Sequence, residues 1–249
     1  MDVSTLVLLS SEAALRRRMD VTANNIANLN TTGFKREAPV FREVVESMDV
    51  GPGGPSGGRR TSFVIDMGVT HDTAEGAFQS TGNPLDAMIQ GEGYFQLRRP
   101  DGTIAYTRAG HFQISATGEL VGPMGFAVVS DSGQPIQVPA DDAARVVISA
   151  DGTVLGPQGE LGRIGIYRIA NEGLLAQAGD GLFDGPTVAA LPANAVRLKV
   201  GGVEGSNVNA VVESAEMIEI MRSYQASQRM ADNINDLRRR SLDRLGSIK

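Results

Sequence analysis

The first 35 residues show an apolar spacing typical of an amphipathic helix. Seven positions repeat at alternating intervals of four and three residues, a heptad seam of about three repeats with two polar members. These positions are Leu8, Glu12, Leu15, Met19, Thr22, Ile26 and Leu29. Gly33 stands where a helix commonly stops, so the pattern predicts an N-terminal helix over residues 1–35.

Residues 205–249 show a second helical pattern with two apolar stripes. The first stripe contains Met217, Met221, Tyr224, Ala231, Ile234, Leu237 and Leu245, and the second contains Val208, Val211, Ala215 and Ile218. Ser206 and Asn207 are candidate N-caps of this helix. Two apolar stripes on one helix imply partners on more than one side.

Residues 36–204 differ from both ends of the chain. Their first part, 36–80, is expected to be a connector with a short helix and an extended segment. The short helix is predicted by Phe41, Val44, Val45 and Met48. A loop with the sequence GPGGPSGG at 51–58 follows and is typical of a flexible link. Residues 81–204 contain short β runs separated by turns such as Asp101-Gly102-Thr103, which predicts a small, largely antiparallel β domain.

Together these patterns predict an α+β fold in which the N- and C-terminal helices pair as an antiparallel, coiled-coil-like stem that carries a β head. The stem alone cannot bury two-sided apolar faces. We expect it to be weakly ordered in the monomer and to become ordered when other copies or partners cover those faces. Repeated head-to-tail contacts of this kind give rings or helical filaments.

Charge and composition narrow the class of protein. The net charge is −6, and residues 1–37 and 205–249 each carry +1, which leaves −8 on the middle of the chain. An acidic balance argues against nucleic-acid binding. The chain has no cysteine, which excludes disulfides and thiol catalysis. The sequence has no apolar run of the roughly 18 residues that a membrane span needs.

The N-terminal residues do not follow the order of a secretory signal peptide. In MDVSTLVLLSSEAALRRR the apolar stretch precedes the arginines, the reverse of the order in a secretory signal peptide. We therefore expect any export from the cytoplasm to use a route that does not read such a peptide.

Four asparagines fall within seven positions at the end of the first predicted helix: Asn24, Asn25, Asn28 and Asn30. Asparagine is a poor residue for a helix interior because its amide competes with the backbone for hydrogen bonds. One interpretation is a frayed, solvated helix end. The other is a set of buried amides, since a buried asparagine in a helical seam can fix its register.

Three segments resemble one family of proteins. ANNIANLNTTGFKR (23–36) resembles the N-terminal signature of the bacterial flagellar rod and hook protein family. TGNPLDAMIQGEGYFQLRRPDGTIAYTRAGHFQISATGELV (81–121) is similar to its central β segment, and EGSNVNAVVESAEMIEIMRSYQASQRM (204–230) to its C-terminal helix motif. Length, the Met1-Asp2 start and the lack of extra head insertions look most like the proximal-rod members, with the distal-rod members next.

The chain departs from the family pattern at a few positions. The C-terminal motif usually has a Glu-Met pair where Ser214 and Ala215 stand, and a Gln where Met221 stands. These departures bear on single stem contacts rather than on membership.

The resemblance implies a structural protein of the flagellar basal body. Such a subunit stacks helically through its terminal helices around an export channel and forms a torque-transmitting shaft, with no catalysis, cofactor or metal. Implied partners are other copies, neighbouring rod proteins and the flagellar type III export apparatus, without nucleic acid or membrane insertion. The implied location is the periplasmic rod, reached without a cleaved signal peptide.

The resemblance and the apolar pattern together suggest which residues form the assembly interface. They are Leu8, Leu15, Met19, Asn24, Asn25, Ile26, Asn28, Thr32, Gly33, Phe34, Asn207, Val208, Met217, Ile218, Met221 and Tyr224.

Other chemistry has little support in the sequence. His71 and His111 are the only histidines, and neither belongs to a metal motif. Asp66, His71 and Asp72 can be drawn as ligands, but solvated loop residues explain them as well. One interpretation of the arginine triplets at 16–18 and 238–240 is phosphate or lipid binding, but arginine runs on helices are usually solvated or ion-paired. Two functions from other classes stay open: a periplasmic binding module and a cell-wall hydrolase with a carboxylate pair.

Overall fold

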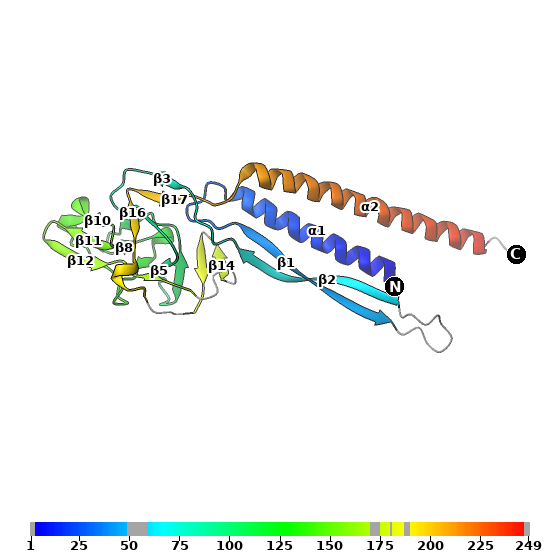
Figure 1. The fold of residues 1–249 in the computed structure, drawn as a ribbon, viewed down its shortest axis with the longest axis horizontal. Helices are drawn as coiled ribbons and strands as arrows, with labels where there is room; N and C mark the ends of the chain where they lie inside the picture. Colours follow the sequence, from blue (N-terminus) through cyan, green and yellow to red (C-terminus); the bar gives the residue numbers. More distant parts are fainter. Residues whose placement is uncertain (1–2, 49–58, 170–174, 180, 187–189, 247–249) are drawn as a thin grey trace. The chain divides into compact units, whose positions relative to one another are not determined.

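The computed structural model describes residues 3–48, 59–169, 175–179, 181–186 and 190–246. Long helices form the two ends of this described chain, and the residues between them form a mainly antiparallel β structure (Figure 1). The fold is therefore α+β, as predicted. The chain divides into a helical unit, drawn from residues 1–26, 37–70 and 210–249, and a β unit, drawn from 27–36 and 71–209.

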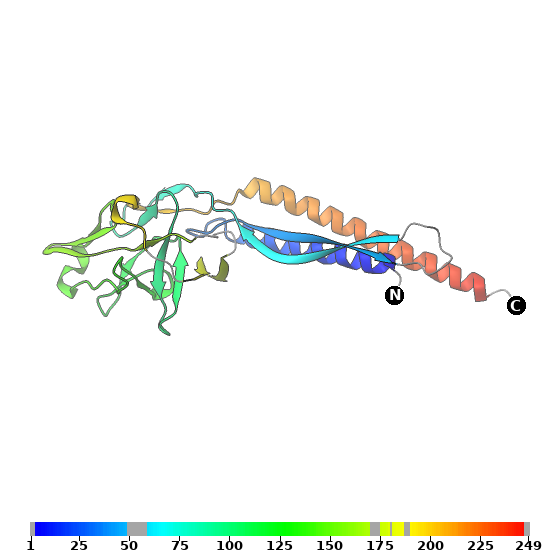
Figure 2. The same ribbon diagram turned by 60° about the horizontal axis from the view of Figure 1, so that its bottom comes forward.

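The helical unit contains two helices and one β-hairpin. Helix α1 (Val3–Ala27) and helix α2 (Ala210–Gly246) run side by side in opposite directions, and strands β1 (Glu37–Met48) and β2 (Arg59–His71) lie beside α1 in both ribbon views (Figures 1 and 2). The hairpin therefore belongs with the helices rather than with the other strands.

The short helix expected at 41–48 is wrong, because these residues lie in strand β1. Val40, Val44 and Val45 are β-branched and favour a strand. Pro39 is compatible with the strand because β1 and β2 form a two-stranded sheet, in which every strand is an edge. The GPGGPSGG segment at 51–58 lies outside the described residues.

Helix α1 ends at Ala27, so a helix over residues 1–35 is too long. Two consecutive turns follow: the backbone NH of Thr31 donates to the carbonyl of Asn28, and the NH of Phe34 donates to that of Thr31, both at 3.2 Å. The Thr31 hydroxyl also donates to Asn28 Oδ1 at 3.0 Å. Short polar side chains that bond locally compete with helical hydrogen bonds, which explains the early stop.

Helix α2 begins at Ala210, after both candidate N-caps. The Ser206 hydroxyl accepts a hydrogen bond from the backbone NH of Val208, within the turn that precedes the helix. The Asn207 side chain bonds to other segments of the β unit instead. Asn209 is the residue directly before the helix, so the predicted caps were placed two or three residues too early.

The first apolar stripe predicted on α2 is only partly right. The inward positions, buried or half-buried, repeat at intervals of four and three residues: Glu213, Met217, Ile220, Tyr224, Ser227, Ala231 and Ile234. Met221 and Leu237 are exposed, so they do not belong to the inward face. Ile220, which was not predicted, is fully buried there. The side chain of Leu245 lies outside the described residues. Three members of the second stripe, Val211, Ala215 and Ile218, are exposed, and Val208 is half-buried.

The β unit contains an eight-stranded sheet with the order β14-β15-β6-β5-β9-β8-β7, in which β13 also pairs with β5. A three-stranded sheet (β10-β11-β12) and the pairs β16-β4 and β17-β3 complete it, and all these pairings are antiparallel. Within the described part of this unit, three short 3-10 helices, η1, η2 and η4, lie between the strands.

The bounds of these elements are β3 (Phe78–Ser80), β4 (Ala87–Ile89), β5 (Tyr94–Arg98), β6 (Ile104–Thr107), β7 (Gln113–Ile114), β8 (Leu120–Val121), η1 (Pro123–Gly125), β9 (Ala127–Val128), η2 (Ala140–Arg145), β10 (Val147–Ile148), β11 (Thr153–Gly156), β12 (Gly159–Arg163), β13 (Ile166–Tyr167), β14 (Ala176–Gly179), β15 (Leu182–Asp184), η4 (Ala193–Ala195), β16 (Leu198–Val200) and β17 (Gly202–Glu204).

The predicted hairpin turns are confirmed. Gly102 lies between β5 and β6 with φ of +84°, and Asp101 Oδ1 accepts a hydrogen bond from the backbone NH of Thr103 at 2.9 Å. The same bond joins Asp151 and Thr153 at 3.1 Å. The Thr103 hydroxyl and backbone NH lower the pKa of Asp101 by donating to its carboxylate. The backbone NH and hydroxyl of Thr153 lower the pKa of Asp151 in the same way, so each carboxylate has a structural role in its turn.

The β unit has its own apolar core. Eighteen buried apolar residues pack together, among them Phe95 and Phe112, whose rings meet edge to face with centroids 5.0 Å apart. A second cluster contains Tyr94, Tyr106 and Phe183. The unit therefore buries its apolar side chains within the single chain.

Candidate assembly surface and signature turn

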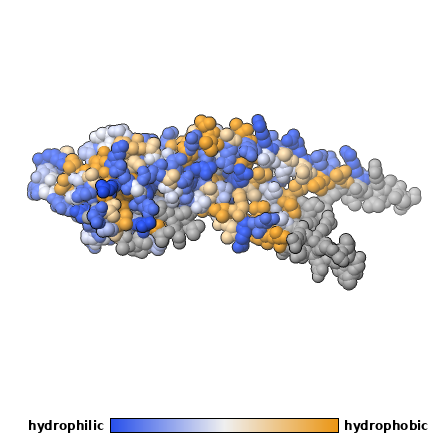
Figure 3. Space-filling model, viewed as in Figure 1, coloured by the Kyte–Doolittle hydropathy of each residue, from blue (hydrophilic) through white to orange (hydrophobic). Residues whose placement is uncertain are grey.

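The helical unit exposes most of the large apolar side chains on the surface of the described chain. Twelve of the fifteen exposed side chains of this kind lie on α1, α2 or the hairpin, although the β unit is the larger one. We name them the exposed apolar set: Leu9, Val40, Val45, Val64, Ile65, Met67, Val211, Val212, Ile218, Met221, Met230 and Leu237. Figure 3 shows apolar side chains along the helices and the hairpin on the face that it presents. Concentrated exposure of this kind is typical of protein–protein contact surfaces.

Polar contacts hold the elements of the helical unit together. Arg16 donates to the hydroxyl of Tyr224 at 2.7 Å and 3.1 Å, and its guanidinium lies over the Tyr224 ring. Arg18 pairs with Glu216 on α2 at 3.1 Å. Arg17 pairs with Asp66 on β2, also at 3.1 Å.

The triplet at 16–18 therefore makes contacts within the chain, which argues against a dedicated phosphate or lipid site there. In the second triplet, Arg239 and Arg240 are exposed, and the side chain of Arg238 lies outside the described residues.

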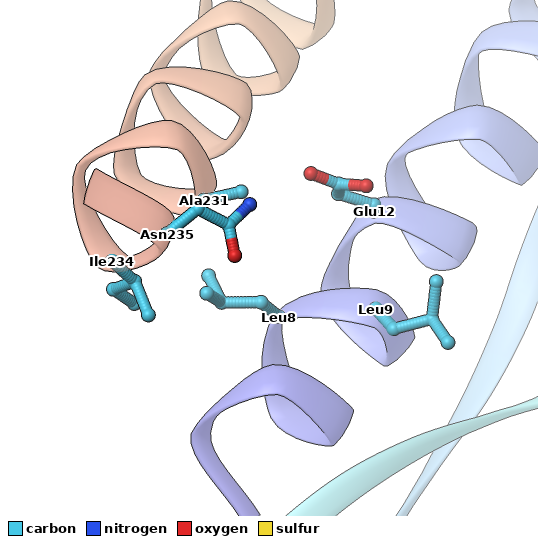
Figure 4. Close-up of a pocket in the computed structure, with 6 residues that line it drawn as sticks. All are labelled: Leu8, Leu9, Glu12, Ala231, Ile234 and Asn235. Atoms are coloured by element: carbon cyan, nitrogen blue, oxygen red, sulfur yellow. The ribbon is translucent and has the colours of Figure 1, made fainter. Parts of the chain in front are cut away.

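A cavity of about 100 Å³ lies between the two helices, near the start of α1. Figure 4 shows Leu8 pointing between the helices towards Ala231 and Ile234, with Glu12 and Asn235 at the polar side of the space. Leu9 also lines it. Small-molecule sites usually measure about 300–1,000 Å³. This cavity is closer to the volume of one aliphatic side chain, so it does not favour a ligand-binding module.

Asn25 joins three elements of the helical unit. Its side-chain NH2 donates to the carbonyl of Glu37 at 2.9 Å and to Glu213 Oε2 at 3.1 Å. Its side-chain oxygen accepts from the backbone NH of Glu37 at 2.9 Å. Asn24 also donates to Glu37, through Oε2 of that residue. Only an amide side chain can donate and accept in this way, which explains an asparagine inside the last turn of α1.

Asn25 is 1 % exposed, so it is not part of a solvated, frayed helix end. Of the two interpretations of the asparagine cluster, the buried amide holds for this residue. Its partners, however, belong to the same chain.

The residues that follow α1 form the signature turn, which we define as residues 27–36 of the β unit. Gly33 has φ of +69°, and a Cβ atom there would overlap the backbone nitrogen of Ala109. Its NH donates to the carbonyl of Glu204 at 2.8 Å. Phe34 is fully buried beside it. Glycine is therefore required by both the conformation and the close approach.

Lys35, Arg108 and Glu204 form a buried ionic cluster in the β unit. Lys35 Nζ lies 2.7 Å from Glu204 Oε1 and donates to the carbonyl of Ala74 at 2.7 Å. Arg108 Nη1 lies 3.6 Å from Glu204 Oε2. Burial lowers the pKa of Lys35 despite the adjacent carboxylate, because desolvation disfavours the charged amine.

Asn207 holds the segment that leads into α2. Its side-chain oxygen accepts from the backbone NH of Arg36 at 2.6 Å, and its NH2 donates to the carbonyls of Asp72 and Ala74. Its own NH donates to the carbonyl of Phe34 at 3.3 Å. The C-terminal helix motif (204–230) therefore forms hydrogen bonds directly to the signature turn, through Asn207.

The other predicted interface residues fall into two groups. Most are half-buried in the single chain: Leu8, Leu15, Met19, Asn24, Ile26, Asn28, Thr32, Val208, Met217 and Tyr224. Ile218 and Met221 are exposed.

Sequence reasoning missed the residues whose partners are distant along the chain: Lys35, Arg108, Glu204, Glu213 and the apolar side chains of the hairpin. The available signal was that Lys35, Arg108, Glu204 and Glu213 all stand inside the three family segments, at 23–36, 81–121 and 204–230.

The candidate metal and catalytic residues have structural roles. Asp66 pairs with Arg17 and accepts from the backbone NH of Gly68. His71 is buried, and its Nε2 lies 2.9 Å from the carbonyl of Leu175. Among the described residues, no group of three His, Asp or Glu side chains is arranged to hold a metal ion. Neither helix, over the residues described, is long and apolar enough to cross a membrane.

Comparison with known families assigns the chain to the class of flagellar rod and hook proteins. Residues 6–35 match the family "Flagella basal body rod protein", residues 88–156 match "Flagellar hook protein FlgE/F/G D1 domain", and residues 199–244 match "Flagellar basal body rod FlgEFG protein C-terminal".

Curated relatives cover almost the whole chain. The flagellar basal-body rod protein FlgF of Caulobacter vibrioides is 35 % identical over all of both chains. FlgG of Bacillus subtilis is 34 % identical over 92 % of this chain and 94 % of its own, and FlgF of Mesorhizobium japonicum is 32 % identical over 90 % of each. The chain belongs to the flagellar basal-body rod protein family and is a structural subunit of the rod in the flagellar basal body.

Proposed function

We propose that this chain is a proximal-rod subunit that polymerises helically through its helical unit into a torque-transmitting shaft around the export channel. One observation carries this proposal: twelve of the fifteen exposed large apolar side chains among the described residues lie on one unit, while the other unit has a closed core. Copies of the same chain or neighbouring rod proteins can cover this exposed apolar set. Removing apolar surface from water in this way stabilises the assembly by roughly 25 cal/mol per Å² of buried surface. Heterologous contacts then extend the assembly as a helix.

The proximal position follows from the resemblance, and the similarity to a rod protein over the whole length of both chains supports it. In this proposal α1 and α2 form the coiled-coil-like stem, and the subunit has no catalytic role. The flagellar type III apparatus exports the chain to the periplasmic rod without cleaving a signal peptide.

The buried members of the predicted interface have a different role in this proposal. Asn25, Gly33 and Phe34 make their contacts inside the chain, so they shape the subunit rather than touch its neighbours. The exposed Ile218 and Met221 are the predicted residues that remain available for contact on α2.

The test is the double variant Ile218→Asp/Met221→Asp, with Val147→Asp as a matched control. Val147 is an exposed apolar residue of the β unit, 41 % exposed like Met221. We expect the double variant to keep the circular-dichroism spectrum and melting temperature of the monomer but to abolish rod completion and swimming. The control variant should swim normally. Normal swimming of the double variant, or equal loss in the control, contradicts the proposal.

A further inference from the structure

The ionic cluster of the β unit contains more positive than negative charge. Lys35, Arg108 and Glu204 are each at most 2 % exposed, and together they carry a net charge of +1. Burying a charge without a partner is strongly unfavourable. Arg108 Nε and Nη1 and Glu204 Oε2 also have no hydrogen-bond partner in the structure, although Arg108 lies over the ring of Tyr94.

Glu204 is the residue on which the cluster depends. The ion pairs that the structure describes for Lys35 and Arg108 both end on its carboxylate. Glu204 Oε1 also accepts from the backbone NH of Gly76 at 2.9 Å, and the Glu204 carbonyl accepts from Gly33 in the signature turn. Glu204 therefore supplies the one negative charge among these three residues and also accepts a hydrogen bond from the signature turn.

The three charged residues come from three separate segments of the family match. Lys35 lies in the segment 6–35, Arg108 in 88–156 and Glu204 in 199–244. Both cations precede the carboxylate in the chain. Until residues 202–205 are in place, docking of the signature turn would bury two cations without a carboxylate between them.

We propose that Glu204 is an ionic latch: the signature turn docks on the β unit only after the C-terminal segment around Glu204 has joined it. The core around Phe95 and Phe112 does not include the latch and stays folded when the latch is open. The latch thus makes the segment before α2 a condition for ordering the segment after α1. This inference concerns the single chain and does not depend on how subunits assemble.

The test is amide hydrogen exchange on the full-length monomer of Glu204→Gln, a substitution that keeps the shape of the side chain and removes its charge. The informative amides are Gly33 and Gly76, which donate to Glu204, and Asp72, which donates to the signature turn. We expect their exchange to accelerate at least about tenfold, because loss of one partner leaves buried charges uncompensated. The amides of Leu120 and Val129, which donate to the carbonyls of Ile136 and Gln96, should be unchanged.

Two further variants distinguish an effect of the lost Glu204 charge from nonspecific destabilisation of the fold. Asp184→Asn breaks the exposed pair of Arg99 and Asp184 and should leave the Gly33, Gly76 and Asp72 amides unaffected. Arg108→Met/Glu204→Gln returns the cluster to a net charge of +1 and should restore much of the protection, even if Glu204→Gln alone fails to fold. Unchanged exchange in Glu204→Gln, or a double variant no better than the single one, overturns the latch.

Discussion

The two units of this chain distribute their apolar side chains in opposite ways. The β unit buries them in two clusters of its own, and only three large apolar side chains among its described residues are exposed. The helical unit leaves twelve exposed and is held by polar contacts such as those of Arg16 and Asn25. One unit is therefore complete as a single chain, whereas the other presents a surface that other subunits can cover.

The difference also explains where charge is placed. The middle of the chain carries most of the negative charge, and the terminal segments are nearly neutral. Low net charge in the terminal segments suits the proposed packing of their helices against other subunits, because like charges brought together repel.

The largest expected effect is the loss of stability when an apolar side chain is removed from the core of the β unit. Phe95→Ala removes a fully buried ring that packs on Phe112 and should cost about 3–5 kcal/mol of unfolding free energy. Ile218→Ala on α2, at an exposed apolar position, should change monomer stability by less than about 0.5 kcal/mol. Urea unfolding followed by circular dichroism measures both. Similar losses in the two variants would show that the exposed set packs inside the monomer.

The next effect concerns the polar contacts of the helical unit. Asn25→Ala removes the amide that joins α1, β1 and α2 and leaves the NH of Glu37 without its acceptor, at a cost of about 1–3 kcal/mol. Asn30→Ala, at an exposed position, is the control. Exchange of the Glu37 amide should accelerate only in Asn25→Ala. Protection equal to that of the control would mean that this network does not order the unit.

Two glycines sharpen the account of the signature turn. Gly33 and Gly82 both have positive φ, +69° and +75°, but only Gly33 has backbone within reach of a Cβ atom. Gly33→Ala should therefore destabilise the β unit more than Gly82→Ala, for which about 1 kcal/mol is expected from the backbone conformation alone. Thermal unfolding compares the two, and equal shifts in melting temperature would contradict the close packing on Ala109.

The smallest effect is a pH dependence from Lys35. Burial places its folded-state pKa below the ordinary value of 10.5, so the unfolded state binds more protons in the interval between the two values. Wild-type stability relative to Lys35→Met should therefore rise as the pH increases through that interval towards 10.5. Urea titrations at several alkaline pH values measure this difference in stability. A difference that stays constant or falls with pH would be inconsistent with a lowered pKa of Lys35.

Local patterns predicted the parts of the fold that depend on neighbours in sequence. The terminal helices and the turn at Asp101-Gly102 follow from residues within a few positions of one another. The helix predicted at 41–48 was wrong because a short apolar segment fits a helix or a strand equally well. Pairing with residues 59–71 makes this segment a strand.

The contacts that shape the candidate site were not predictable in the same way. Asn25 meets Glu213, 188 residues away, and Lys35 meets Glu204, 169 residues away. The sequence shows that these polar residues exist, but not which of them are buried together. The family motifs nevertheless contain these residues, because the N-terminal and C-terminal motifs contact each other within each unit.

The most direct test of the account compares amide hydrogen exchange in the two units of the purified wild-type monomer, with its mass confirmed by sedimentation. We predict fast exchange over most of α1, α2 and the hairpin, beside slow exchange in strands β5 and β6. Strong protection of both helices along their full length in a confirmed monomer would contradict the account, because it would show that the helical unit is complete without other subunits.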